Sequence, residues 1–303
     1  MNNSKFCLYE KITNDMIEAM EKGIIPWEKP WVGGGPKNAV SGKLYRGINT
    51  LILGFKDYTS PYWLTMNQAN SLGGSIKKGE KATYITFWKF NKFDNGVDNL
   101  GNPRSKTIPI LRYFLVFNVE QCENLKLPKH CETSKLDFNP IAECEKIVNG
   151  YKDAPEIIST YGDRACYIPL MDKINMPSKE SFLSVEKYYD CLFHEFTHSV
   201  RSSNRLNQEN FSGEFSTTHK FSDFNYSGEE LVAQLGASYL SGISGISKAT
   251  EKNSAAYLQG WLTAFKKDKK MIIKAAGMAQ KRADYIQGIR YEKSLEGGDS
   301  QGI

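Results

Sequence analysis

Residues 184–199, SVEKYYDCLFHEFTHS, contain the stretch that decides the fold of the second part of the chain. Within it, His194-Glu195-Phe196-Thr197-His198 places two histidines four positions apart, with a glutamate directly after the first. On a helix, side chains at i and i+4 lie on one face, so both imidazoles can bind one metal ion and the glutamate can reach a water beside it. The chain has only four histidines. Chance predicts roughly 0.004 such pentapeptides in a sequence of this composition.

The surrounding residues predict that this stretch is a buried helix. Ser184 is the expected N-cap, but the capping box is only partial because Lys187 stands where Glu or Gln would complete it. The alternative, a core helix with two hydrogen-bonded histidines, would bury Glu195 at a high cost in free energy. We therefore expect the histidines to line a cleft beside an apolar stripe. The stripe consists of Val185, Tyr188, Tyr189, Leu192, Phe193 and Phe196.

A second helix start supplies the third ligand that a catalytic zinc site requires. The stretch YSGEELVAQL, residues 226–235, offers Glu229 and Glu230. We predict Glu230 as the ligand, because small residues share its side of the helix and would let two helices approach closely. Glu229 as the ligand stays open. So does a purely structural role, in which Ser227 and Glu230 form an S-x-x-E capping box.

These residues predict metal-assisted hydrolysis, with zinc as the cofactor and Mn or another transition metal as an alternative. The ion lowers the pKa of a water, and Glu195 removes the proton as general base. The nucleophile then attacks a polarised carbonyl, for which a peptide bond is the expected substrate. His219 and Tyr226 are candidates for stabilising the oxyanion, although an ordinary surface or packing role explains each more simply.

The composition indicates a folded protein of two domains. The 303 residues are 40% hydrophobic and 24% charged, as in ordinary globular chains. No stretch reaches the length of a bilayer span, and the N-terminal residues lack an apolar signal core, so we expect a cytoplasmic protein with no membrane partner. The six cysteines form no C-x-x-C pair, which disfavours a zinc ribbon, and scattered thiols suit a reducing compartment.

Positive charge and aromatic side chains gather in the first part. Residues 1–125 hold 16 basic and 11 acidic side chains, whereas the other 23 basic and 23 acidic side chains cancel, so this part holds the whole net charge of +5. Unpaired bases stack on aromatic faces while Lys and Arg follow the phosphates, which favours single-stranded nucleic acid as the partner. The alternative is that the tryptophans form core. The interleaved side chains are Trp27, Lys29, Trp31, Lys43, Tyr45, Arg46, Trp63, Lys77, Lys78, Lys81 and Trp88.

We expect an α+β chain with a first domain at residues 1–125, a linker at 126–140 and a second domain at 141–303. The elements expected in the first domain are a helix at 4–22, a short helix begun by Thr65 as N-cap, strands at 82–92 and 110–119, and a polar loop at 94–106. Those expected in the second are a helix at 141–151, strands at 165–168 and 172–177, the two metal-binding helices, a long connection at 199–228, and helices at 254–267 and 268–285.

Over nearly its full length the chain resembles the ArdC anti-restriction proteins of conjugative plasmids and phages. The motifs that carry the resemblance in the first part are Pro26-Trp27, Lys29-Pro30-Trp31, Tyr45-Arg46-Gly47-Ile48-Asn49, Trp63-Leu64-Thr65, Gln68-Ala69, Lys77-Lys78-Gly79-Glu80-Lys81 and Phe117-Asn118-Val119-Glu120-Gln121. Those in the second part are Asp172-Lys173-Ile174-Asn175-Met176-Pro177, His194-Glu195-Phe196-Thr197-His198, Arg205-Leu206 and Glu229-Glu230-Leu231-Val232-Ala233.

The resemblance implies an N-terminal mixed α/β domain that binds single-stranded DNA and a mostly helical, zincin-like metallopeptidase domain with a small sheet. It also implies that the protein shields incoming plasmid or phage DNA from host restriction. The expected DNA contacts are Trp27, Lys29, Trp31, Tyr45, Arg46, Asn49, Trp63, Lys77, Lys78 and Lys81. Two alternatives remain: a non-catalytic DNA shield whose metal is structural, and a metallopeptidase that cleaves a host defence protein. The sequence leaves the oligomeric state open.

One residue departs from the family pattern. The pattern usually continues Glu-Glu-Leu-Val-Ala-Glu, whereas this chain has Gln234 at the last position. In gluzincins, which this site resembles, an acid four residues after the ligand Glu commonly supports a ligand histidine. A Gln still hydrogen-bonds there but adds no charge, so we expect weaker metal affinity or turnover.

Overall fold

The computed structural model describes residues 7–27, 35–97, 103–131, 139–159, 162, 164–208, 228–246 and 255–290. The chain forms two compact units, each discontinuous in sequence. Of the described residues, 7–27, 35–36, 46–61 and those from 139 to 290 form the helical unit, and 37–45, 62–97 and 103–131 form the sheet unit. The α+β class and the two-domain architecture are confirmed. The division differs from the single cut predicted near residues 126–140, because two early helices pack with the C-terminal ones.

The sheet unit is built on four strands in the order β1-β2-β5-β4. Thr65 caps α3 with the reciprocal hydrogen bonds of a full capping box, as predicted. A small core of Ala39, Leu64, Ala69, Phe117 and Cys122 lies beneath these elements. The elements are β1 (Lys37–Asn38), β2 (Tyr62–Leu64), α3 (Met66–Ser71), β3 (Ser75–Ile76), β4 (Thr83–Val97), β5 (Pro103–Asn118), η1 (Val119–Gln121), β6 (Cys122–Glu123) and η2 (Lys129–Cys131).

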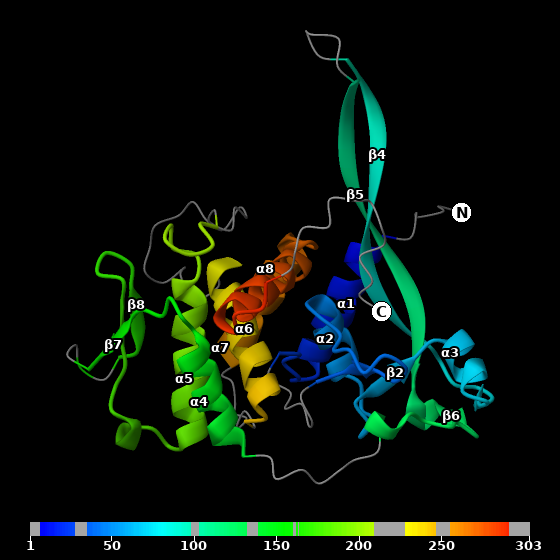
Figure 1. The fold of residues 1–303 in the computed structure, drawn as a ribbon, viewed down its shortest axis with the longest axis horizontal. Coiled ribbons are helices and arrows are strands. Elements are labelled where there is room, and N and C mark those ends of the chain that lie inside the picture. Colours follow the sequence, from blue (N-terminus) through cyan, green and yellow to red (C-terminus); the bar gives the residue numbers. More distant parts are fainter. Residues whose placement is uncertain are drawn as a thin grey trace. The chain divides into compact units, whose positions relative to one another are not determined.

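Strands β4 and β5 form a long antiparallel ribbon (Figure 1). They pair from Thr83↔Val116 to Val97↔Pro103, whereas β2 pairs only with Phe117 and Asn118 at the end of β5. Beyond that end, the described residues form two strands of the ribbon. The predicted loop at 94–106 is wrong at both of its ends, where the chain is paired strand. Cross-strand backbone hydrogen bonds continue there despite the low strand propensity of Asn, Asp and Gly.

The helical unit contains seven helices and a three-stranded sheet among the described residues. The helices are α1 (Leu8–Glu21), α2 (Ile48–Gly54), α4 (Pro140–Gly150), α5 (Val185–Ser199), α6 (Gly228–Ser244), α7 (Ala255–Lys267) and α8 (Met271–Ile286). The sheet has the order β7 (Glu156–Ile158), β9 (Lys173–Asn175), β8 (Cys166–Ile168), with η3 (Lys179–Ser181) after it. The sequence predicted β8 and β9 but not β7. No described helix is long and apolar enough to cross a bilayer.

Helix α6 is the centre of this unit and packs against α5, α4 and α8. Most of its side chains are buried, so it is apolar nearly all round rather than amphipathic. Gly236 lets α5 and α6 touch, because an added Cβ would lie 2.4 Å from Cγ2 of Thr197. This close approach brings the start of α6 beside the HEFTH stretch of α5.

Candidate metal centre

Three side chains from two helices converge on one point in the helical unit. His194 and His198 of α5 and Glu230 of α6 each offer one ligand atom, and these atoms all lie within 4.8 Å of one another. The Nε2 atoms of the two histidines are 3.1 Å apart, and Glu230 Oε1 lies 3.3 Å from Nε2 of His194. Glu230 Oε2 lies 3.6 Å from Nε2 of His198.

This donor set fits a transition metal. Zn–N and Zn–O bonds of about 2.0–2.1 Å in a tetrahedron put neighbouring ligand atoms about 3.3 Å apart. The separations of 3.1, 3.3 and 3.6 Å bracket that value. Two imidazoles with one carboxylate are also the ligand set of His₂Glu catalytic zinc sites.

Glu229 supports the site from the far side of His198. Its Oε1 lies 3.2 Å from Nδ1 of His198, so an Nδ1–H donor there leaves the Nε2 lone pair pointing at the ligand cluster. Arg282 of α8 donates to both oxygens of Glu229, at 2.7 and 3.0 Å, and is fully buried. The alternative of Glu229 as third ligand therefore does not match the cluster. Ser227, which would complete the capping box, lies outside the described residues.

The acids around His198 create a strong negative field. Burial by itself lowers the pKa of His198, but the carboxylates of Glu229 and Glu230 outweigh it and raise the pKa to about 9. Burial raises the pKa of Glu229, yet His198 and Arg282 lower it to about 2. The two histidines likewise hold the pKa of Glu230 well below its usual range despite burial. A divalent cation at the cluster would be stabilised by the same field.

Glu195 is held beside the cluster by a backbone group of the small sheet. Its Oε2 accepts a hydrogen bond of 2.7 Å from the N–H of Tyr167, in the edge strand β8. Glu195 is 8% exposed, so little water competes for its carboxylate. The HEFTH stretch lies in α5, and Ser184 accepts from the N–H of Lys187 at its N-terminus, as the sequence predicted.

Gln234 supports the glutamate of the cluster rather than a histidine. Its Nε2 donates to Glu230 Oε1 at 3.3 Å, and its Oε1 accepts from the indole N–H of Trp27 at 3.1 Å. The expectation that position 234 supports a ligand histidine is thus corrected, because Glu229 occupies that place. A carboxamide both donates and accepts, so it joins Trp27 to Glu230 without adding charge.

The residues predicted to bind DNA divide between the two units. Trp27, Arg46 and Asn49 belong to the helical unit, whereas Tyr45, Trp63, Lys77, Lys78 and Lys81 belong to the sheet unit. Lys29 and Trp31 lie outside the described residues, as do His219 and Tyr226.

Burial corrects part of this prediction. Trp27 is fully buried and packs edge-on against Trp261 and Phe265, at centroid distances of 5.8 and 6.0 Å. Trp63 is 2% and Tyr45 is 5% exposed, so none of these three rings presents a face to a base. For these three residues, the alternative that the rings form core is the correct one.

The polar candidates have different surroundings. Asn49 is buried, and Arg46 forms an ion pair with Asp284 within the helical unit. In the sheet unit, Lys77, Lys78 and Lys81 are exposed on the turn before β4, where the Lys77 ammonium donates to the carbonyl of Glu120. Among the described members of the predicted set, these three lysines are the exposed ones and are accessible to a phosphate.

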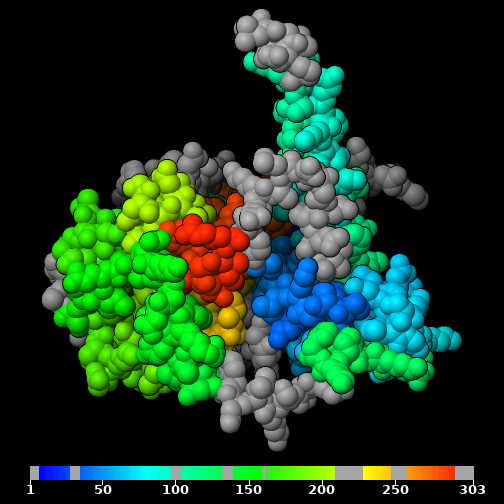
Figure 2. Space-filling model, viewed as in Figure 1, coloured from blue at the N-terminus to red at the C-terminus, as the bar shows by residue number. Residues whose placement is uncertain are grey.

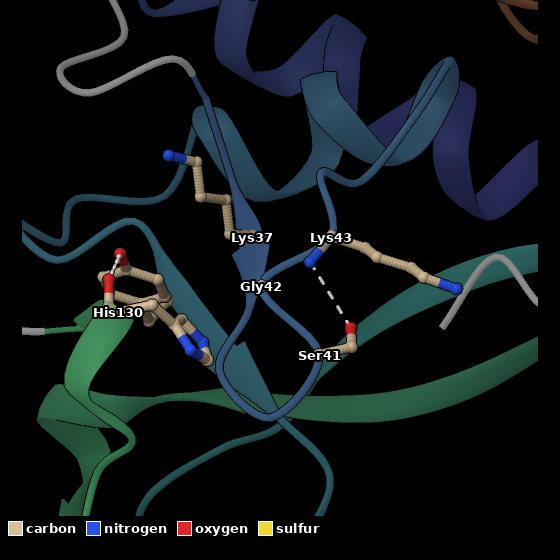
Figure 3. Close-up of a pocket in the computed structure, with 6 residues that line it drawn as sticks. Lys37, Ser41, Gly42, Lys43 and His130 are labelled. Carbon is tan, nitrogen blue, oxygen red and sulfur yellow. Dashed lines mark hydrogen bonds between the residues drawn. The ribbon is translucent and has the colours of Figure 1, made fainter.

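The sheet unit also has an open surface pocket of about 400 Å³ beside β1 and β2. Tyr62 donates through its hydroxyl to the carbonyl of His130 at 2.5 Å, and Gly42 faces the imidazole (Figure 3). The two lysines of the lining, Lys37 and Lys43, point in different directions (Figure 3). Their charge does not converge on one point, so we assign no site there.

The two parts of the chain match two known domain families. Residues 6–117 match the N-terminal domain of anti-restriction factor ArdC, and residues 144–278 match a zincin-like metallopeptidase family. The fold and the histidine–glutamate cluster therefore define a two-domain protein with a zincin-like metallopeptidase domain.

Solved structures extend the match to the whole chain. The metal-free crystal structure of antirestriction ArdC from plasmid R388 is 34% identical, with a TM-score of 0.74, over 94% of this chain and 98% of that chain. The Mn(II)-bound structure of the same protein is 33% identical, with a TM-score of 0.71, over the same shares of both chains. This chain belongs to the ArdC antirestriction protein family.

Related sequences occur in longer and in similar-sized proteins. Two proteins named DNA primase TraC, from Escherichia coli, are 30% and 29% identical over 95% and 97% of this chain. The chain spans only 20% and 28% of their lengths. Protein y4eC of Sinorhizobium fredii is 27% identical over 92% of this chain and 91% of its own length.

Proposed function

We propose that this chain is an antirestriction protein that binds single-stranded DNA and carries a divalent-metal peptidase centre. The observation that carries the peptidase half is the convergence of His194, His198 and Glu230 within 4.8 Å, with Glu195 directly after the first histidine. The Mn(II)-bound R388 relative supports a divalent ion at this cluster. Zinc stays the prediction from the ligand set.

Each residue of the centre has a chemical role in this proposal. His194, His198 and Glu230 hold the ion, which when bound acts as a Lewis acid that polarises a carbonyl and acidifies water. Glu195 is the general base, and the Tyr167 N–H fixes the orientation of its carboxylate. Glu229, anchored by Arg282, orients His198.

Strand β8 supports a peptide as the substrate. It forms one edge of the described sheet β7-β9-β8 and packs against α5. The Tyr167 N–H points from this edge to Glu195, so the outer edge of β8 runs past the base. An extended peptide that pairs with this edge would bring its carbonyls to the cluster.

The DNA half of the proposal is supported by the family of the N-terminal domain and by charge. Residues 1–125 hold the entire positive excess, and Lys77, Lys78 and Lys81 lie exposed on one turn of the sheet unit. Binding should be tighter to single strands than to duplex and should weaken steeply as salt rises. Equal affinity for both forms would contradict a stacking interaction.

One experiment tests the peptidase half. Wild type, Glu195→Gln and Glu186→Gln are loaded with Zn or Mn, their metal content is measured, and cleavage of a peptide library is followed by mass spectrometry. Glu186 lies in the first turn of the same helix and serves as the matched control. We expect all three proteins to hold one ion and only Glu195→Gln to lose cleavage. Undiminished cleavage by Glu195→Gln would reject the assignment, and a wild type that binds metal but cleaves nothing would support the structural-metal alternative.

A further inference from the structure

The β4–β5 ribbon is longer than its own unit needs. Its strands have 15 and 16 residues, and 15 residues extend roughly 50 Å at about 3.4 Å each. Figure 1 shows the ribbon running outward from the short strands and α3 of the sheet unit. An isolated two-stranded hairpin is only marginally stable in water, and exposed strand edges invite unwanted pairing. A ribbon of this length is costly to maintain, which points to a binding role.

One face of the ribbon presents exposed aromatic rings. Trp88 pairs with Leu111, Phe90 with Pro109 and Tyr113 with Thr86, so the three aromatic side chains alternate onto the same face. Their exposed fractions are 40%, 59% and 48% for Trp88, Phe90 and Tyr113. Exposed rings grouped on one face form an apolar patch, and such patches mark interaction sites. Figure 2 shows the side chains of the ribbon, coloured teal, in space-filling form.

The other face packs differently. Phe87 and Phe114 stack on each other there, with centroids 4.6 Å apart and an interplanar angle of 14°. This pair ties the strands together. Phe93, which is 46% exposed and pairs with Lys106, lies further out on the same face. The ribbon therefore has rings on both faces: Trp88, Phe90 and Tyr113 lie on the face that we name the aromatic face, and the second face holds the Phe87–Phe114 stack, in which Phe114 is 39% exposed.

The charge of the ribbon indicates which class of partner it binds. Its two strands carry five basic residues and one acidic residue, Asp94, and the basic side chains are all exposed. An apolar protein partner would strip water from these cations without neutralising them. A phosphate backbone neutralises them. Lys92 pairs with Thr107 on the face of Trp88, whereas Lys89, Lys106 and Arg112 lie on the opposite face. Their long stems reach round the edge of the two-stranded ribbon. The cations are Lys89, Lys92, Arg104, Lys106 and Arg112.

The spacing of the rings suits unpaired bases. Trp88 and Phe90 are two positions apart on one strand, which is about 6.8 Å. A stacked base occupies about 3.4 Å along its axis, so the spacing leaves room for one base at each ring. A ribbon can also enter the major groove of a duplex, but groove contacts use base edges, and the aromatic faces would stay unused.

We propose that the aromatic face of the β4–β5 ribbon is the surface that binds single-stranded DNA. Bases stack on Trp88, Phe90 and Tyr113, and the cations of the ribbon follow the phosphates. This assignment rests on the proposed single-strand binding. It moves the centre of that binding from the buried Trp27 and Trp63 to the ribbon. The exposed lysines of the turn before β4 belong to the same unit as the ribbon.

The test uses the full-length chain and a fluorescein-labelled oligo(dT) of 20 nucleotides, with a duplex of the same length as the comparison. The variants are Trp88→Ala/Phe90→Ala and the control Phe93→Ala, which removes an equally exposed ring from the opposite face. Stacking contributes enough per base that each lost ring should weaken binding about tenfold or more. We expect the double variant to lose at least about a hundredfold in affinity and Phe93→Ala to match wild type, with unchanged thermal unfolding in both.

Two further readouts separate stacking from a general structural effect. Trp88→Phe should keep the affinity within a fewfold, because the phenyl ring still stacks. It should also reduce the quenching of tryptophan fluorescence that we expect DNA to cause in wild type. Lys92→Gln/Arg112→Gln should reduce the slope of log affinity against log salt by about 0.7 per cation.

The outcomes distinguish this inference from the proposed function. A wild type with no affinity for oligo(dT) would refute the proposed DNA-binding function as a whole. Wild-type binding that survives Trp88→Ala/Phe90→Ala would overturn the ribbon assignment alone. Tighter binding to the duplex, lost in the double variant, would place the ribbon in a groove and overturn the stacking proposal.

Discussion

Arg282 is the residue whose loss should most clearly reveal how the metal centre is built. Its side chain is fully buried, and it donates to both oxygens of Glu229, to the carbonyl of Thr197 and to Gln208. Arg282→Met keeps the aliphatic bulk and removes every donor. Among the described residues, Glu229 then stays as a buried carboxylate balanced by His198 and by the more distant Arg201, at 3.9 Å.

The expected magnitude follows from burial. Breaking a buried ion pair by removing one partner costs about 3–5 kcal/mol, because the other charge is left uncompensated. Glu229 is 8% exposed, so solvent screens little of that cost. For a unit of this size, 1 kcal/mol shifts the midpoint of thermal unfolding by about 2–4 °C. We therefore expect Arg282→Met to lower the midpoint by roughly 10 °C.

The assay is urea and thermal unfolding of metal-free protein, with Lys266→Met as the control. Lys266 pairs with Glu21 on the surface, where removal should cost less than about 1 kcal/mol. A double-mutant cycle with Glu229→Gln completes the test. Because the double variant holds neither charge, its loss should be clearly smaller than the sum of the single losses. A loss below about 1 kcal/mol for Arg282→Met, or strictly additive losses in the cycle, would refute the account of Arg282 as the anchor of Glu229.

Three other predictions concern the same unit. Chelation of the metal should lower the thermal midpoint of wild type, because removing an ion present at 100 times its dissociation constant removes about 2.7 kcal/mol of stabilisation. Glu230→Ala should unfold at the same midpoint with and without chelator. Gln234→Ala should weaken metal binding in a competition with a chelating dye, whereas Gln234→Glu should strengthen it by adding a charge beside Glu230; the reverse order would contradict the bridging role. The Arg205 guanidinium lowers the pKa of Asp172, so this pair stabilises the fold above the unfolded pKa of about 3.9, and that contribution is lost as pH falls through the lower folded value. Acid titrations of unfolding should show this loss in wild type and not in Asp172→Asn, whose Asn tolerates the positive φ of 50° at that position.

Local signals predicted most of the secondary structure. The three- and four-residue spacing of apolar residues before His194 predicted α5, and Thr65 as N-cap predicted the start of α3, where Gln68 completes the capping box. These signals depend on neighbours within one or two turns, so a single sequence contains them. The exact reach of β4 and β5 was not predicted, because long-range pairing decides whether residues rich in Asn and Gly continue a strand.

The tryptophans show where local reasoning fails. Trp27 stands in a Pro- and Gly-rich stretch that reads as loop, yet it is fully buried and hydrogen-bonded to Gln234, which is 207 positions away. Trp88 stands in a regular strand pattern, yet its ring is 40% exposed. Burial depends on what the fold brings together, and side chains of one type can serve as core or as contact surface.

The sequence by itself determined the chemistry that is available: two imidazoles at helical spacing, a carboxylate between them, and a pair of acids at the start of a later helix. Spacing along one helix is a local property, so the His194–His198 pair was predictable. Only the tertiary structure decided that Glu230 joins the cluster while its neighbour Glu229 turns to His198 and Arg282. Adjacent helical residues point about 100° apart, and which of the two faces α5 depends on how α6 packs, through Gly236, against its neighbours.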